Sequence, residues 1–93
     1  MLEKLGVKYK LSQSARLKYD KFSGNYYLFC IKSGNHVRIN RTSYDILVLV
    51  QEGKNQDEIA AFQCKEYDVD LKNSQRDIHD LFQFLLKNGF MNT

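Results

Sequence analysis

The side chains that most often carry chemistry, cysteine and histidine, are few in this 93-residue chain. The cysteines are Cys30 and Cys64, and the histidines are His36 and His79. No pair has the short C-x-x-C or H-x-x-x-H spacing at which neighbouring side chains hold a metal ion. Cys30 falls in an apolar, strand-like stretch and Cys64 in a helix-like one, which favours small packing residues over metal ligands. We therefore expect no metal site and no cofactor.

Catalysis requires a nucleophile or an acid–base pair within mutual reach, in a pocket that excludes water. No motif of this kind occurs in the sequence, and a domain of this size has little room for a pocket. The expectation is a non-catalytic protein with no catalytic residues.

Charge is divided unevenly along the chain. Residues 1–41 contain nine Lys/Arg against two Asp/Glu, a balance of +7, and residues 42–93 contain five against nine, a balance of −4. The longest aliphatic run, residues 46–50, is far shorter than the ~20 residues that span a bilayer. The N-terminus has no apolar signal core. These features predict one cytoplasmic domain over residues 1–93, with no membrane partner.

Alternation of apolar and polar residues predicts strands in the first part of the chain. The alternating or apolar stretches are residues 7–11, 15–19, 26–31 and 36–40. The first lies in an N-terminal segment, residues 1–13, which we expect to be flexible or to form an edge strand. Turn signals at residues 23–25 and 33–35 connect the other three as an antiparallel sheet.

The stretch 26–31 is apolar on both faces, which predicts the central strand and leaves one row of side chains without a helix to cover it. The two rows are Tyr26, Leu28 and Cys30, and Tyr27, Phe29 and Ile31. Either the N-terminal segment folds across the uncovered row, or a partner protein or a second copy of the chain does.

Three helices are predicted after the strands. The first runs from about Thr42 to Glu52, with Asn40 or Thr42 as its cap. The second follows a capping box formed by Asn55 and Glu58 and continues to about residue 67.

The third helix runs from about residue 71 to 88 after Asp70, unless Ser74 or Asp77 caps a shorter one. Its apolar stripe is Ile78, Leu81, Phe82 and Leu85, with Phe84 off the stripe. The order of elements predicts an α+β, winged-helix-like fold: a three-stranded antiparallel sheet followed by three helices.

This order fits two functions. A winged-helix DNA-binding regulator would present a basic helix to the groove, but acidic residues such as Glu58 and Asp77 lie on the second and third helices and would repel phosphate. Nucleic acid is therefore the less favoured partner. Alternatively, residues 36–40 form an exposed last strand that can pair with an extended peptide. Arg38 and Arg41 would then attract acidic peptide residues, or they are only edge charges that prevent aggregation.

Several motifs resemble the PqqD-like proteins. Residues 38–46 (RINRTSYDI) are similar to their LN-x-T-x-x-x-I turn, and residues 53–59 (GKNQDEI) to their G-x-T-x-x-E-I. The order YDVD, DI, FLL and GFM in residues 67–91 matches their C-terminal half in spacing and type. Ile39, Asn55 and the bulky Tyr44 stand where Leu, Thr and a small residue are usual.

The resemblance spans residues 14–91 and implies a RiPP recognition element, a non-catalytic domain that binds the leader segment of a ribosomally made precursor peptide. It implies that the leader adds as a strand beside the third strand and lies against the third helix, for delivery to a radical-SAM protein, cyclase or leader peptidase. A dimer remains an alternative assembly. The peptide-binding residues expected on this basis are His36, Val37, Arg38, Ile39, Asn40, Arg41, Asp77, Leu81 and Phe84.

Overall fold

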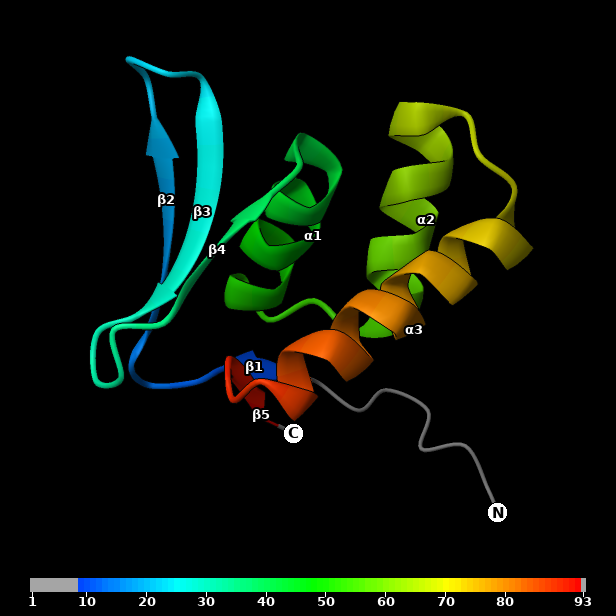
Figure 1. Ribbon diagram of the computed structural model, residues 1–93. Helices are drawn as coiled ribbons and strands as arrows, with labels where there is room; N and C mark the ends of the chain where they lie inside the picture. Colours follow the sequence, from blue (N-terminus) through cyan, green and yellow to red (C-terminus); the bar gives the residue numbers. More distant parts are fainter. Residues whose placement is uncertain (1–8, 93) are drawn as a thin grey trace.

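The computed structural model describes residues 9–92, in which a three-stranded antiparallel sheet is followed by three helices (Figure 1). The strands are β2 (Ala15–Asp20), β3 (Asn25–Cys30) and β4 (His36–Ile39), in the spatial order β2-β3-β4. The expected fold class is confirmed, and so is the central place of β3. Ile31, expected as its last residue, lies just beyond its end.

The register of the strands decides which row of β3 faces the helices. Leu28 pairs with Leu17 on one side and with Val37 on the other, and it is fully buried. Successive side chains of a strand point to opposite faces. Tyr27 and Phe29 therefore point away from the helices, which decides between the two rows: theirs is the row that the described helices leave uncovered.

The helices begin where their caps predict. They are α1 (Arg41–Gln51), α2 (Gln56–Tyr67) and α3 (Leu71–Lys87). The side chains of Asn40, Asn55 and Asp70 each accept a hydrogen bond from the backbone N–H three residues on, and Asn55 completes the expected capping box with Glu58. Each bond satisfies an N–H that has no partner within the helix.

The structure decides between the alternatives that the sequence left open at two helix starts. Asn40, expected both as the last residue of the strand and as one of two possible caps, lies just beyond β4, and its side chain caps α1. Thr42 therefore lies inside α1 rather than before it. Ser74 and Asp77 do not start a shorter third helix; Ser74 is buried within α3, where its hydroxyl donates to Gln63 Oε1 of α2 over 2.7 Å.

The core lies between the sheet and the helices. Two helices supply much of it: Ile46, Leu47 and Val50 from α1, and Ile78, Phe82 and Leu85 from α3. The expected stripe of the third helix is confirmed for its buried residues, with Leu81 half-buried at its margin. Within the described part of the chain, no helix is long and apolar enough to cross a membrane.

A small second sheet, which the sequence did not predict in full, joins the two ends of the described chain. In it β1 (Lys10–Leu11) pairs antiparallel with β5 (Met91–Asn92). Gly89, at φ +79°, turns the chain after α3, and Phe90 N–H donates to Leu85 C=O over 2.9 Å. Glycine adopts this left-handed conformation without a steric cost.

The described part of the N-terminal segment does not cover the uncovered row of the sheet. It runs beside α1 and β5, and the Tyr9 ring lies 4.9 Å from that of Phe82. Residues 7 and 8 of the expected first strand lie outside the described residues.

Candidate functional site

β4 is an edge strand whose second edge is open within residues 9–92. It begins after a tight turn in which Gly34 has φ +79° and its N–H donates to Cys30 C=O over 2.8 Å. Cys30 N–H in turn donates to Asn35 C=O over 2.8 Å, which aligns the two strands.

This alignment decides which backbone groups of β4 face the open edge. Hydrogen-bonded and non-hydrogen-bonded pairs alternate along antiparallel strands. Counting from the bonded pair at Asn35, Val37 and Ile39 direct their N–H and C=O groups toward β3. His36 and Arg38 therefore direct theirs toward the open edge, where an extended peptide could accept and donate hydrogen bonds.

The side chains of β4 alternate between the two faces of the sheet. Val37 and Ile39 are half-buried and pack against the hydrophobic core. His36 and Arg38 are exposed and lie opposite Phe29 and Tyr27, on the face away from the helices. The sequence placed all four residues in one site, and the structure divides their side chains between two faces.

Three expected residues lie along one side of α3. Asp77, Leu81 and Phe84 are spaced four and three residues apart, so they are neighbours on the helix surface. Leu81 packs against the core margin, whereas Phe84 is 46% exposed and Asp77 is exposed.

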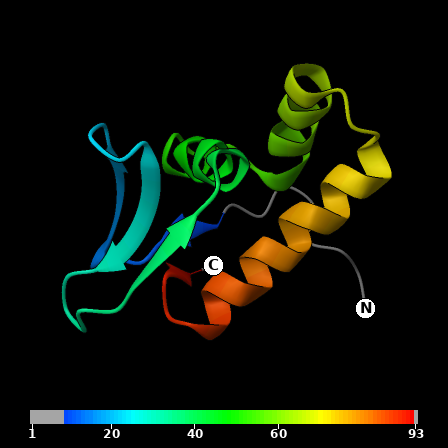
Figure 2. The same ribbon diagram turned by 45° about the horizontal axis from the view of Figure 1, so that its top comes forward.

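Partly exposed apolar side chains lie both on β4 and on α3. Val37, Ile39 and Leu81 are all partly exposed side chains that pack against the same hydrophobic cluster. Figure 2 shows α3 on the side of the open edge of β4, with α1 at the upper end of β4. Val37 and Ile39 are the apolar side chains on the strand whose edge is open.

Asn40 and Arg41 lie at the far end of this strand, at the beginning of α1. Arg41 is largely exposed, and its Nε lies 3.9 Å from Asp45 Oδ2 in an i,i+4 ion pair. Both residues border a polar hollow of about 380 Å³ that also includes Arg38 and Asn25. Asn25 comes from the β2–β3 hairpin, a neighbour that periodicity in the sequence could not reveal.

Asp45 also connects α1 to α2, because it accepts a hydrogen bond from the Tyr67 hydroxyl. This bond raises the pKa of Tyr67 above its ordinary value, since the carboxylate holds the phenol proton, and burial acts in the same direction. The bond joins the second turn of α1 to the last residue of α2.

The bulky Tyr44 has a packing role that explains its presence. Its ring lies 4.7 Å from that of Tyr26, which in turn lies 4.8 Å from that of Tyr19. The three rings join α1 to the inner face of β3 and β2, so the helix accommodates the large residue by stacking it on the sheet.

The cysteines and histidines do not form a cluster with other possible metal ligands in the described part of the chain. Cys30 and Cys64 are free thiols, and residues 9–92 contain no group of three or more His, Cys, Asp or Glu that could hold a metal ion. Hydrogen bonding by Ser33 lowers the pKa of the Cys30 thiol. The site offers an open strand edge, partly exposed apolar side chains and nearby cations, which are features suited to binding.

Comparison with known proteins identifies a family. Residues 25–91 match the family model of PqqD, coenzyme PQQ synthesis protein D. Among curated proteins, none matches the chain significantly.

Solved structures share the fold. A lasso peptide synthetase B1 in complex with a leader peptide has a TM-score of 0.83 at 24% identity, covering 94% of this chain and 100% of that chain. TbiB1 in complex with the TbiA(β) leader peptide has a TM-score of 0.80 at 24% identity, covering 89% of this chain and 94% of that chain.

The PqqD truncation of PqqCD from Methylobacterium extorquens, a stand-alone RiPP recognition element, has a TM-score of 0.78 at 19% identity, covering 91% of this chain and 88% of that chain. The family model spans well over half of the sequence and includes β3, β4 and all three helices. This chain belongs to the PqqD family.

Proposed function

We propose that this chain is a non-catalytic recognition domain that binds the leader segment of a ribosomally made precursor peptide and presents it to a modifying enzyme. The leader adds as a strand along β4. The enzyme it serves is a radical-SAM protein, a cyclase or a leader peptidase.

The observation that carries this proposal is the open edge of β4, together with partly exposed apolar side chains on β4 and α3. Two backbone positions, His36 and Arg38, are directed to that edge. Every second side chain of an added strand would contact partly exposed apolar residues, namely Val37, Ile39 and Leu81. Backbone pairing sets the register of such a peptide, and the side-chain contacts set its specificity. Membership of the PqqD family and the leader complexes of similar folds support the same function.

Arg38 adds a charge preference to this site. A strand paired to β4 would place a side chain beside Arg38 on the face away from the helices. We expect acidic leader residues at that position, so Arg38→Glu should weaken leader binding. The remaining affinity should depend less on salt concentration, because an exposed charge pair that salt screens has been removed.

Amide hydrogen exchange tests strand addition directly. We expect a short precursor among the reading frames that neighbour this gene, and the probe is a synthetic peptide corresponding to its N-terminal half. Saturation with it should slow exchange at the amides of His36 and Arg38, which gain hydrogen bonds. Val37 and Ile39 already bond to β3, so their exchange should change less.

N-methylated versions of the peptide give a matched control. Methylation at every second residue, on the amides that face β4, should abolish binding measured by fluorescence polarisation. Methylation at the intervening residues should not. Equal loss from both peptides, or no slowing at His36 and Arg38 on saturation, would show that the leader does not add to β4.

A further inference from the structure

The face of the sheet that points away from the helices, here called the outer sheet face, has an apolar centre between two basic margins. Each β3 residue at its centre lies between two partners: Tyr27 between Lys18 and Arg38, and Phe29 between Arg16 and His36. Ile31 continues this row beyond the end of β3. The outer sheet face consists of Arg16, Lys18, Tyr27, Phe29, Ile31, His36 and Arg38.

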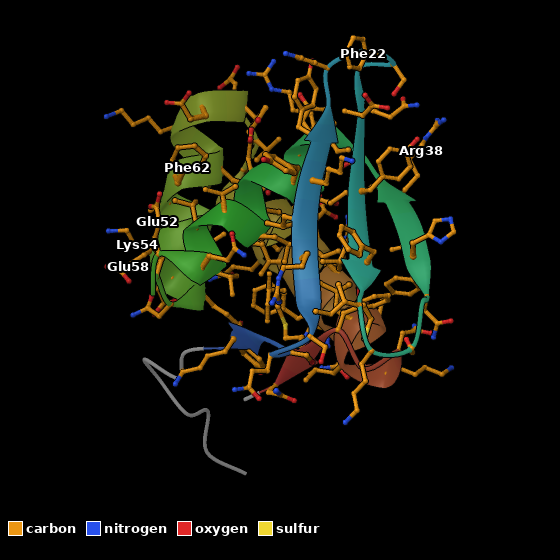
Figure 3. The ribbon with its side chains drawn as sticks, turned by 90° about the vertical axis from the view of Figure 1, so that its left-hand side faces the viewer. Phe22, Arg38, Glu52, Lys54, Glu58 and Phe62 are labelled. Carbon is orange, nitrogen blue, oxygen red and sulfur yellow. The ribbon has the colours of Figure 1, made fainter. Side chains whose placement is uncertain are left out.

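No described element covers this face. In Figure 3 the strands β2, β3 and β4 lie in front of the helices, and the face is turned to the viewer. Ile31 is 58% exposed, and a hollow of about 440 Å³ lies over Tyr27, Phe29 and Ile31. An aromatic and aliphatic row left exposed on a small domain marks an interaction surface.

The charge around the row has one sign. Arg16, Lys18 and Arg38 are all exposed cations. Asp20 is the only acidic residue in these three strands, and its carboxylate is occupied in the β2–β3 turn, where it accepts from Phe22 N–H and from the Ser23 hydroxyl, each at 3.0 Å. A complementary surface must therefore be apolar at its centre and acidic at its rim.

This charge argues against a second copy as the occupant. Two-fold pairing through the outer sheet face would place the same cations of both copies around one apolar patch, and like charges oppose such pairing. Stacked nucleotides also fit less well. The rings of Tyr27 and Phe29 are half-buried, and the most exposed residue of the row is the aliphatic Ile31, whereas base stacking uses open aromatic faces.

We propose that the outer sheet face is the docking surface for the modifying enzyme, which meets it with an apolar patch rimmed by Asp and Glu. This inference rests on the proposed function and adds to it the place where the enzyme binds.

The position of β4 connects the two surfaces. His36 and Arg38 direct their backbone groups to the open edge and their side chains to the outer sheet face. A leader strand paired at the edge would extend the sheet by one strand, and every second side chain of the leader would lie on the same face as the docked enzyme. The enzyme would thus contact both the domain and the bound leader.

The test compares two double variants of the full chain. Lys18→Glu/Ile31→Asp alters the outer sheet face at two residues outside the leader site. Lys72→Glu/Leu71→Asp makes the same changes on α3, where Leu71 is 53% exposed, close to the 58% of Ile31. We expect the modifying enzyme among the reading frames that neighbour this gene; the purified enzyme is the probe, and its binding is measured by biolayer interferometry. Leader affinity of each variant is measured separately by fluorescence polarisation.

The outer-face variant should lose at least about tenfold in enzyme affinity, the scale of one interface hot spot. It should bind the leader as the parent does, and the α3 variant should bind both partners normally. Enzyme binding unchanged by the outer-face variant, or weakened equally by the α3 variant, would overturn the proposal. A parent that fails to bind the leader would instead refute the proposed function.

Two other occupants give distinct results that would also overturn it. If a second copy covers the face, sedimentation will show a parent dimer that the outer-face variant loses. If nucleic acid covers it, the parent will bind a short oligothymidylate or oligouridylate with steep salt dependence, and the outer-face variant will not.

Discussion

The residues of β4 show how one position can serve two surfaces. The backbone of Arg38 faces the open edge of the sheet, while its side chain lies beside Tyr27 on the outer sheet face. Val37 is the reverse case, since its backbone bonds to β3 and its side chain packs on the core beneath the leader site. A substitution of a β4 side chain therefore leaves the backbone hydrogen bonds of strand addition in place.

Phe84 is the residue whose truncation best tests the apolar contact of the leader. It is 46% exposed on α3, so Phe84→Ala should leave the fold intact and weaken leader binding by about 1–3 kcal/mol if the ring anchors the peptide. Phe22→Ala is the matched control, because Phe22 is 92% exposed at the tip of the β2–β3 hairpin (Figure 3). Fluorescence polarisation with the labelled leader measures both. Equal affinity of the Phe84 variant and the parent would remove Phe84 from the site.

Tyr67 provides a test of the bond between α1 and α2 through its pH dependence. The pKa of Tyr67 is raised in the folded state by its bond to Asp45, so the stabilisation is fully present below the unfolded value of ~10 and is lost as pH rises through the folded value. At pH 7, Tyr67→Phe should lower the free energy of unfolding by about 1–2 kcal/mol. Above pH ~10 the difference from the parent should shrink.

Urea unfolding at several pH values measures this difference, and Asp45→Asn supplies its control. In the Asp45→Asn background the bond to a carboxylate is absent, so Tyr67→Phe should cost less and its pH dependence should weaken. A cost that stays constant from pH 7 to strongly alkaline pH would show that the hydrogen bond to Asp45 does not stabilise the fold.

At the scale of elements, the sequence predicted what local signals determine. The caps Asn40, Asn55 and Asp70 act within one helical turn, and they set the starts of α1, α2 and α3 correctly. The pairing of β1 with β5 depends on contacts between residues about 80 positions apart, so no local pattern could indicate it. Ser74 shows the same limit, since its polar side chain reads as a cap until α2 is seen to bury it.

Ser74 and Gln63 give the element-scale prediction. They are the two buried polar residues of the described chain, and their 2.7 Å hydrogen bond joins α2 to α3. Ser74→Ala should reduce the free energy of unfolding by about 1–3 kcal/mol, because Gln63 Oε1 loses its buried donor. The double variant Gln63→Leu/Ser74→Ala should cost less than the sum of the two single changes, as measured by urea unfolding. If the cost of the double variant equals the sum of the two single costs, the hydrogen bond between Ser74 and Gln63 does not stabilise the fold.

At the scale of the whole molecule, the uneven charge along the sequence becomes a difference between the sheet and the helices. The basic first part of the chain forms the sheet, and the acidic second part forms the helices behind it. The sequence predicted the open strand, the alternation of its side chains and the apolar stripe of the third helix, but not which row of β3 the helices cover. That depends on the register of β4 with β3, which the turn at Gly34 and the bond from Cys30 to Asn35 determine.

If the leader and the enzyme meet on one extended sheet, each should strengthen the binding of the other. Coupling of this kind is reciprocal: the factor by which saturating leader raises enzyme affinity must equal the factor by which saturating enzyme raises leader affinity. We expect a factor of about 5 to 150, the usual range for coupled sites. Calorimetric titration of the enzyme with the domain, with and without leader, gives one factor, and fluorescence polarisation of the leader gives the other. Arg38→Glu, which alters the residue between the two surfaces, should reduce both factors together. A factor of one in the parent would mean that the enzyme docks without touching the bound leader.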